Sequence, residues 1–180
     1  MFILSFMLNS QFGSSPFVFH LGSIFLHIIA AYFVFWLFLE LGFKKEISFL
    51  SSLLFAVHPA VAPVAVWVPG RIEAILTIFT ALSFIMFIRY LRTGDWRYMA
   101  VFFVSFTIAL LTKEVVISLL PVLLFYYLIY RKEKLMSDKD PVDKRHSMSV
   151  RPFIHRVLPL GLAAIIIVWF FVRKNILAGA

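Results

Sequence analysis

The stretch that decides the fold begins at Phe17 and ends at Leu39, and it reads FVFHLGSIFLHIIAAYFVFWLFL. It contains no formally charged residue over 23 positions. As an α-helix it would be about 34 Å long, which matches the roughly 30 Å hydrocarbon core of a bilayer. A secretory signal would be shorter, would follow a basic segment and would end in small residues, and the first 39 positions have none of these features. The stretch therefore predicts a membrane-spanning helix.

The composition of the whole chain also indicates a membrane protein. Hydrophobic residues make up 62% of the 180 positions, charged residues make up 14%, and the mean hydropathy is +0.97. A soluble domain has about half apolar and a quarter charged residues, so a soluble fold of this size could not bury so much apolar surface. The absence of cysteine excludes disulfides, thiolate metal sites and cysteine nucleophiles. The net charge of +8 follows membrane topology, so nucleic acid is not an expected partner.

Further apolar segments bring the expected number of spans to about six. They are residues 47–66, 72–88, 98–111, 115–130 and 157–172. A single helix over residues 98–130 would be about 50 Å long, which is too long for a bilayer. Lys113 and Glu114 are therefore expected to mark a turn between two shorter passes. The predicted fold is an all-α, polytopic transmembrane helix bundle.

Lysine and arginine are distributed unevenly between the two faces that six alternating passes create. One face carries thirteen of them, namely Lys44, Lys45, Arg89, Arg92, Arg97, Arg131, Lys132, Lys134, Lys139, Lys144, Arg145, Arg151 and Arg156. The other face carries Arg71, Lys113, Arg173 and Lys174. The positive-inside rule places the first face in the cytoplasm. Met1 would then lie outside, which leads us to interpret residues 1–180 as one transmembrane module that is a fragment of a larger domain.

The one long polar segment, residues 131–156, contains eight basic and four acidic residues. It shows no apolar periodicity and is expected to form a cytoplasmic basic loop. The loop would either bind anionic lipid headgroups, at about 1 kcal/mol per basic residue near the surface, or act as a solvated linker that only sets topology.

Four charged residues lie at span boundaries on the exterior face: Arg71, Glu73, Lys113 and Glu114. A charge at the centre of the bilayer costs about 2.5 to 3.5 kcal/mol, so these residues are expected at an interface or in a polar cavity. One interpretation is a site for an anionic substrate, in which Arg71 and Lys113 contact a phosphate and a carboxylate orients them. The alternative is two ordinary interfacial ion pairs.

Prolines interrupt the chain just before these charges. The segment HPAVAPVAVWVPGR, residues 58–71, has three prolines within eleven positions, which opposes a regular helix. Irregular backbone at membrane depth is tolerated where protein or a watery cavity satisfies it. His58 would therefore either contact a substrate or transfer a proton, or form a hydrogen bond at the helix end.

Two further histidines, His20 and His27, are seven positions apart and would share a helix face turned toward the bundle. They lack a neighbouring carboxylate, so they are expected to be packed, hydrogen-bonded residues and not metal ligands. The sequence has no Gly-rich phosphate loop, nucleophile elbow or zincin motif.

Three blocks resemble a known family. The run FAVHPAVAPVAVWVPGRIEAIL, residues 55–76, resembles the His-Pro, Trp and Gly-Arg-x-acid pattern of membrane proteins related to the tetratricopeptide-repeat O-mannosyltransferases, which belong to the GT-C glycosyltransferases. LLTKEVVISLLPVLL, residues 110–124, is similar to the Lys-Glu segment of that family. FVFHLGSIFLHIIAAYFVFWLF, residues 17–38, resembles its second span.

The resemblance implies a GT-C-like membrane glycosyltransferase. Its donor would be a polyprenyl or dolichyl phosphate sugar, and the sugar would pass to a protein or glycan hydroxyl on the exterior face. A carboxylate in the first exterior loop of such enzymes removes the acceptor proton, while cations stabilise the departing phosphate. His58, Arg71, Glu73, Lys113 and Glu114 are the substrate-binding residues that this resemblance implies. The catalytic base is expected upstream of the chain, so no catalytic residue is assigned.

The sequence departs from the family pattern in two places. Pro63 stands where relatives often have a carboxylate, and no tetratricopeptide repeats follow the last expected span.

The leading hypothesis is thus that the chain is part of a membrane glycosyltransferase and is inactive alone. The alternative is a non-catalytic membrane protein that binds or moves lipid-linked sugars. The expected partners are a lipid-linked sugar donor, a protein or glycan acceptor and membrane lipid. A divalent metal in the complete enzyme is left open. The membrane would be the bacterial inner membrane, or the endoplasmic reticulum in a eukaryote.

Overall fold

The computed structural model describes residues 16–61 and 70–137, with side chains to residue 132, and isolated positions before and after these ranges. This part of the chain is helical and contains no strand, which confirms the all-α prediction. The elements are α2 (Pro16–Glu40), α3 (Lys45–Val57), α5 (Arg71–Thr93), α6 (Trp96–Thr112), the 3-10 helix η2 (Glu114–Ser118) and α7 (Leu119–Ser137).

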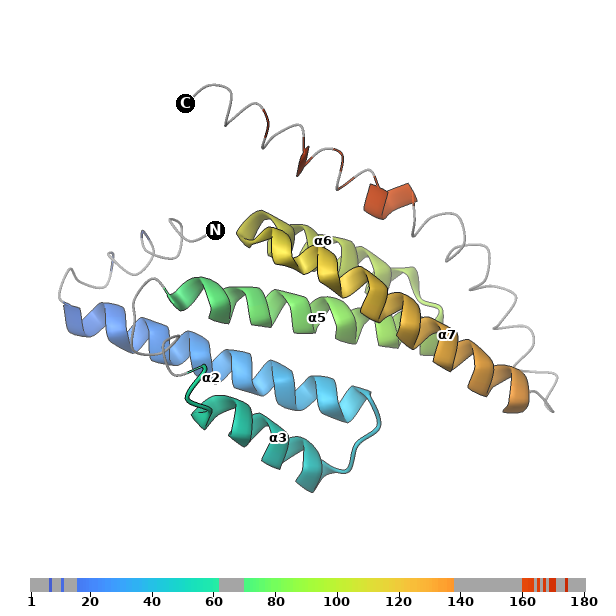
Figure 1. Cartoon of the computed structure of the whole chain (residues 1–180), viewed down its shortest axis with the longest axis horizontal. Helices are drawn as coiled ribbons and strands as arrows, with labels where there is room; N and C mark the ends of the chain where they lie inside the picture. The colour runs from blue at the N-terminus through green and yellow to red at the C-terminus, as the bar shows by residue number, and fades with distance from the viewer. Residues whose placement is uncertain are drawn as a thin grey trace.

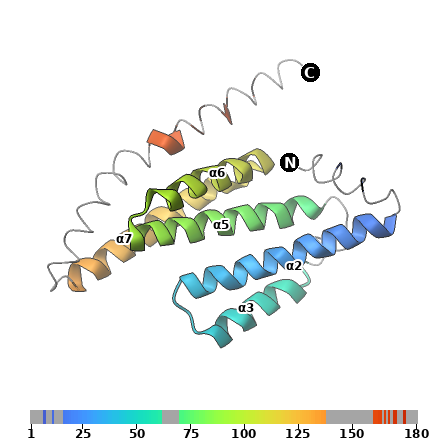
Figure 2. The same cartoon turned by 180° about the vertical axis from the view of Figure 1, so that it is seen from behind.

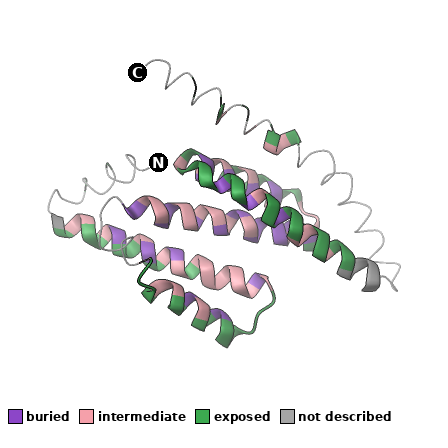
Figure 3. Ribbon diagram, viewed as in Figure 1, coloured by how far each residue is buried: buried purple, intermediate pink, exposed green. Residues whose placement is uncertain are grey.

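Helix α5 lies at the centre of the bundle (Figures 1 and 2). It packs against α2 on one side and α6 on the other, and α3 packs on the outer side of α2. In its most apolar stretch 67% of the residues are buried, against 17% for the corresponding stretch of α2 (Figure 3). The exposed apolar faces of α2, α3 and α7 are therefore the surfaces that lipid would cover.

Aromatic side chains fill the interface between α5 and α6. Phe87, Phe102 and Phe106 are almost fully buried there, and the rings of Phe102 and Phe106 stack with their centroids 5.9 Å apart. One polar contact crosses this interface, a hydrogen bond of 3.0 Å from Ser83 Oγ to Ser105 Oγ. Small hydroxyl residues of this kind join transmembrane helices without burying an unpaired polar group.

Long-range contacts show which helix ends lie together. Glu40, the last residue of α2, contacts Arg89 and Arg92 near the end of α5, so α2 and α5 run in the same direction. Tyr130 of α7 donates a hydrogen bond of 2.9 Å to the carbonyl of Leu91, which places the distal part of α7 at the same end. We call this the Glu40 end, and we call the opposite end, where α5 begins, the Arg71 end.

The turn between α5 and α6 follows from two residues. Gly94 has a positive φ of 72°, a conformation that favours glycine, and its N–H donates to Tyr90 O at 2.8 Å. Asp95 then caps α6 by accepting a hydrogen bond of 2.9 Å from the N–H of Arg97. This tight turn makes α5 and α6 antiparallel neighbours.

The predicted break in the long apolar run is confirmed. Helix α6 ends at Thr112, Lys113 is extended with φ −159° and ψ 135°, and η2 begins at Glu114. The turn needs neither glycine nor proline, because a single extended residue redirects the chain.

The helix predicted over residues 47–66 is shorter in the structure than expected. Helix α3 has 13 residues and ends at Val57, because Pro59 disfavours a helical conformation at the residue before it and His58 is extended with ψ 131°. At about 20 Å, α3 is shorter than the hydrocarbon core of a bilayer. Residues 62–69 lie outside the described part.

Three described helices are long and apolar enough to cross a membrane: Phe17–Glu40, Arg71–Thr93 and Glu114–Lys132. Helix α6 is apolar but has only 17 residues. In the last predicted span, the described residues Leu162, Ile165 and Trp169 pack against the main core. Most of the predicted basic loop, 131–156, lies outside the described residues.

Candidate functional site at the Arg71 end

Arg71 is the first residue of α5 and is 1% exposed. Its Nη2 donates a hydrogen bond of 2.7 Å to the carbonyl of Phe19, and its Nε and Nη2 lie 3.4 Å and 3.3 Å from Ser23 Oγ. A cation at a helix N-terminus opposes the helix dipole, so this position needs compensating contacts. They come from the beginning of α2, which is thereby joined to the beginning of α5.

Glu73 and Lys113 form an ion pair between the beginning of α5 and the end of α6. Lys113 Nζ lies 2.5 Å from Glu73 Oε1, and the two side chains are 43% and 45% exposed. The predicted site residues Glu73 and Lys113 are thus brought together although they are 40 positions apart. The carboxylate that contacts Lys113 thus comes from Glu73 of α5, another helix.

Arg71 and Glu73 point to different neighbours. Two positions along a helix correspond to a rotation of about 200°. Arg71 accordingly contacts α2, whereas Glu73 contacts Lys113 at the end of α6. Convergence of Arg71 and Lys113 on one phosphate stays a prediction.

His58 lies in the exposed turn that follows α3. Its Nδ1 accepts a hydrogen bond of 3.1 Å from the N–H of Ala60, and its carbonyl accepts one of 2.9 Å from the N–H of Val61. The imidazole therefore stabilises the His-Pro turn in which it lies.

Of the other two histidines, only His27 faces the bundle. His27 is 7% exposed, lies 2.9 Å through Nε2 from the carbonyl of Ala56, and stacks on the ring of Phe55. His20 is exposed, which corrects the expectation that both are packed. The two do share a helical face, but His20 lies one turn from the beginning of α2, where the described helices do not cover it.

Two cavities lie beside these residues. One has a volume of about 400 Å³ and is lined by His27, Phe55, Val61, Glu73 and Thr77, among others. We call it the His27 cavity. The other has a volume of about 380 Å³, is largely apolar, and runs between α2, α5 and the beginning of α7. Thr77 lines both cavities, so they are neighbours.

The depth of these groups follows from the helix rise. Ser23 is 17 positions before Glu40 and His27 is 13, which corresponds to about 26 Å and 20 Å along α2. If Glu40 marks one boundary of a roughly 30 Å hydrocarbon core, the Arg71 contacts lie near the other boundary. The His27 cavity then lies about one helical turn deeper.

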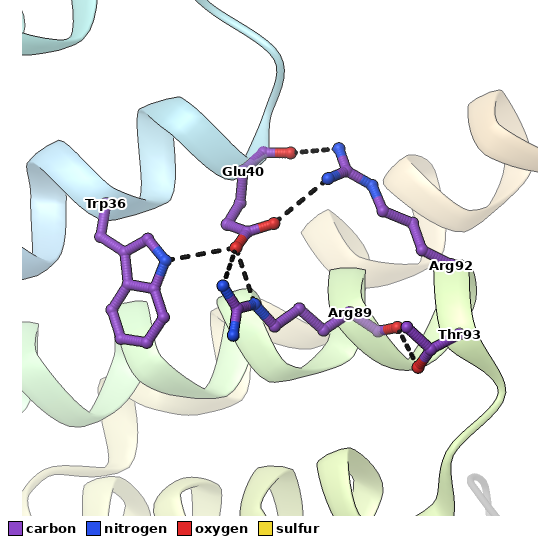
Figure 4. Close-up of polar contacts among 5 residues, drawn as sticks. All are labelled: Trp36, Glu40, Arg89, Arg92 and Thr93. Carbon is purple, nitrogen blue, oxygen red and sulfur yellow. Dashed lines mark hydrogen bonds and ion pairs between the residues drawn. The ribbon is translucent and has the colours of Figure 1, made fainter. Parts of the chain in front are cut away.

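A second polar cluster, at the Glu40 end, was missed from the sequence (Figure 4). Glu40 Oε1 accepts hydrogen bonds from Trp36 Nε1 at 3.2 Å and Arg89 Nε at 2.7 Å, and Oε2 accepts one from Arg92 Nη1 at 3.2 Å. Arg89 also lies over the Trp36 ring, 5.0 Å from its centroid. The sequence did contain a signal for this cluster, because a carboxylate at a helix C-terminus is unfavourable without cationic partners.

The described residues contain no group of three or more His, Cys, Asp or Glu side chains that could hold a metal ion. The polar groups at the Arg71 end are the cations of Arg71 and Lys113 and the hydrogen-bonding side chains of His27, Glu73 and Thr77.

Comparison with known proteins assigns the family. The model of the dolichyl-phosphate-mannose-protein mannosyltransferase family matches residues 2–141. The chain belongs to this family. It is also 29% identical over 119 residues, 66% of its length, to the protein O-mannosyl-transferase Tmtc1 of Drosophila melanogaster. It is 31% identical over 94 residues, 51% of its length, to the mouse protein O-mannosyl-transferase TMTC1.

These alignments cover only 14% of the fly protein and 10% of the mouse protein. No solved structure matches the chain. Family membership and the apolar helices together make this an integral membrane protein with a GT-C-like helix bundle.

Proposed function

We propose that this chain forms part of a membrane mannosyltransferase that takes mannose from a polyprenyl or dolichyl phosphate donor and transfers it to a protein or glycan hydroxyl. The family match over residues 2–141 is the observation that carries the proposal. Residues 1–180 act in it as one transmembrane module, and residues 131–156 as a cytoplasmic loop. The Arg71 end faces the exterior or the lumen.

Lys113 is the residue best placed to bind the donor phosphate. The Lys113 side chain is 43% exposed, and within the described part of the chain its ammonium group has one short hydrogen bond, to a carboxylate that is itself exposed. A phosphate can displace such a carboxylate at little cost, because an exposed ion pair contributes about 0 to 1 kcal/mol. The new charge-assisted contact, partly shielded from water, is worth about 1.5 to 3 kcal/mol.

Arg71 supports the same site from the α2 side. Its guanidinium already joins α5 to α2 through Phe19 and Ser23, so it fixes the beginning of α5 and with it Glu73. A donor phosphate would reach Arg71 only by exchanging one of these contacts. Arg71 therefore carries a structural role in addition to any phosphate contact.

The test is an assay of mannose transfer and donor binding in the protein with all of its natural sequence, in native membranes supplied with polyprenyl phosphate mannose. Lys113→Gln and Arg71→Gln should each lower donor binding or transfer about ten- to a hundredfold, since 1.4 kcal/mol is a factor of ten. Arg97→Gln is the matched control, because Arg97 is exposed at the Glu40 end, and it should leave both quantities unchanged.

Three results would contradict the proposal. Normal donor affinity in both variants would remove the phosphate role. Donor binding without transfer to any hydroxyl acceptor would favour the alternative, a protein that binds or moves lipid-linked sugars. Loss of folded Arg71→Gln protein with normal donor affinity in Lys113→Gln would leave Arg71 with only its structural role.

A further inference from the structure

The His27 cavity has an unusual set of polar groups. It lies between the middle of α2, the turn after α3 and the beginning of α5, and its lining includes His27, Phe55, Glu73 and Thr77. The rings of His27 and Phe55 stack with centroids 5.8 Å apart and an interplanar angle of 29°. The cavity therefore combines two aromatic rings with several hydrogen-bonding side chains.

The hydrogen bond of His27 to α3 fixes what its other nitrogen can do. The partner of Nε2 is the carbonyl of Ala56, which can only accept, so Nε2 carries the proton and donates. In the neutral imidazole, Nδ1 is then an acceptor. This Nδ1 is buried, and the described residues provide no hydrogen-bond partner for it. Leaving a buried acceptor unpaired is unfavourable, so a donor from a ligand would be favoured there.

The other polar side chains of the cavity also present acceptors. Glu73 is a carboxylate, and only its Oε1 is bound by Lys113. Thr77 donates its hydroxyl proton to the carbonyl of Glu73 at 2.8 Å, which leaves the lone pairs of its oxygen as acceptors. Because Lys113 balances the charge of Glu73, the cavity does not attract a cation strongly. The ligand that fits is uncharged and rich in hydroxyl donors.

We propose that the His27 cavity binds a sugar ring, with His27 Nδ1 accepting a hydrogen bond from one sugar hydroxyl and the His27 and Phe55 rings packing against the ring carbons. The identification of the sugar as mannose rests on the proposed function. Since Nδ1 is buried, occupation requires a local shift of the residues that line the cavity.

Two substitutions distinguish the roles of the two nitrogens of His27. In His27→Gln the side-chain amide lies near the position of Nε2, so it can still donate to the Ala56 carbonyl but offers no acceptor at Nδ1. In His27→Asn the amide lies near the position of Nδ1, so an acceptor remains while the contact to α3 is lost. His20→Gln is the control, because His20 is exposed on the same helix.

The binding experiment uses the chain in lipid nanodiscs with methyl α-mannopyranoside as the probe and choline as a cationic control probe. Methyl mannoside should bind His27→Gln about five- to tenfold more weakly than the parent and bind His20→Gln normally, as expected for one lost hydrogen bond. His27→Asn should retain most of the affinity but melt at a lower temperature. Choline should not bind at the cavity.

A second measurement needs no variant. In the parent chain with ¹⁵N-labelled histidine, the Nδ1 resonance of His27 should shift when methyl mannoside is added, because its lone pair gains a hydrogen bond. Unchanged affinity in His27→Gln, or an Nδ1 resonance that does not respond to the sugar, would overturn the proposal. If His27→Gln does not fold, the resonance of the parent decides.

The source of the sugar is distinguished by a second probe. If the cavity holds the donor sugar, mannosyl phosphate should compete with methyl mannoside and should bind more tightly, through Lys113. If it holds a sugar of the acceptor, both should bind together. Mannoside binding that depends on His27, without any mannose transfer, would contradict the enzymatic function but support this site. Mannose transfer with mannoside binding that does not depend on His27 would support the enzymatic function but contradict this site.

Discussion

The two ends of the bundle use charged residues in opposite ways. At the Glu40 end, one carboxylate whose side chain is 11% exposed is contacted by two arginines and a tryptophan. At the Arg71 end, as far as the described residues show, Glu73 has a single lysine partner, both of these side chains are more than 40% exposed, and His27 Nδ1 has no partner. A saturated cluster stabilises the fold, whereas polar groups with unused hydrogen-bonding capacity can bind a ligand.

The arrangement of contacts supports this difference. The Glu40 cluster also includes a backbone contact, since Arg92 Nη2 donates to the carbonyl of Glu40 at 2.5 Å, and this carbonyl lies at the C-terminus of α2. Arg89 and Arg92 thus satisfy both the carboxylate and the helix end. At the Arg71 end, by contrast, Glu73 and His27 line a cavity of about 400 Å³.

The largest expected effect concerns which side of the membrane each end faces. Trp96 and Val115 are 68% and 56% exposed and lie at the turns of the Glu40 end and the Arg71 end, and the chain has no cysteine. In intact cells that carry the protein in their surface membrane, a membrane-impermeant thiol reagent should label Val115→Cys and not Trp96→Cys. Permeabilisation should make Trp96→Cys reactive. Labelling of Trp96→Cys alone before permeabilisation would reverse the orientation.

The next effect is on stability at the Glu40 end. Glu40→Gln leaves two arginines without their carboxylate, and breaking a fully buried pair costs about 3 to 5 kcal/mol. Because the arginines are 36% and 46% exposed, we reduce the expected loss to about 2 kcal/mol. Thermal unfolding in nanodiscs measures it, with Glu46→Gln, an exposed acid of α3, as the control. Binding of methyl mannoside by the folded fraction should not change, and a loss of binding there would contradict the separation of the two ends.

Much of the fold could be predicted from the sequence, because lipid imposes simple rules. A long uncharged run must span the membrane, and two charges inside a mostly apolar run of 33 positions must interrupt it, as Lys113 and Glu114 do. The extent of α3 was less predictable. Its apolar composition continues beyond Val57, but Pro59 ends the helix, so here local backbone geometry outweighed hydropathy.

The candidate site was predictable in its residue types and not in its pairings. Charge at a span boundary singled out Arg71, Glu73 and Lys113, but hydropathy contains no information on rotation about α5. That rotation decides that Arg71 contacts α2 and that Glu73 contacts Lys113. The Glu40 cluster joins residues 49 and 52 positions apart, and only the packing of α2 beside α5 brings them together.

The smallest expected effect is on stability at the Arg71 end, where Glu73→Gln makes the same chemical change as Glu40→Gln. The pair with Lys113 is exposed on both sides, so its loss should lower the free energy of unfolding by about 0.5 kcal/mol. Salt should increase the difference between the effects of Glu73→Gln and Glu40→Gln, because the Debye length falls from about 10 Å at 0.1 M to about 3 Å at 1 M. The effect of Glu73→Gln should therefore disappear in 1 M salt, whereas most of the effect of Glu40→Gln should remain, since its carboxylate is largely shielded from solvent. Equal losses at the two ends, or an equal response to salt, would show that the Glu73 pair is also a structural cluster, and the distinction between a closed end and a ligand-binding end would then fail.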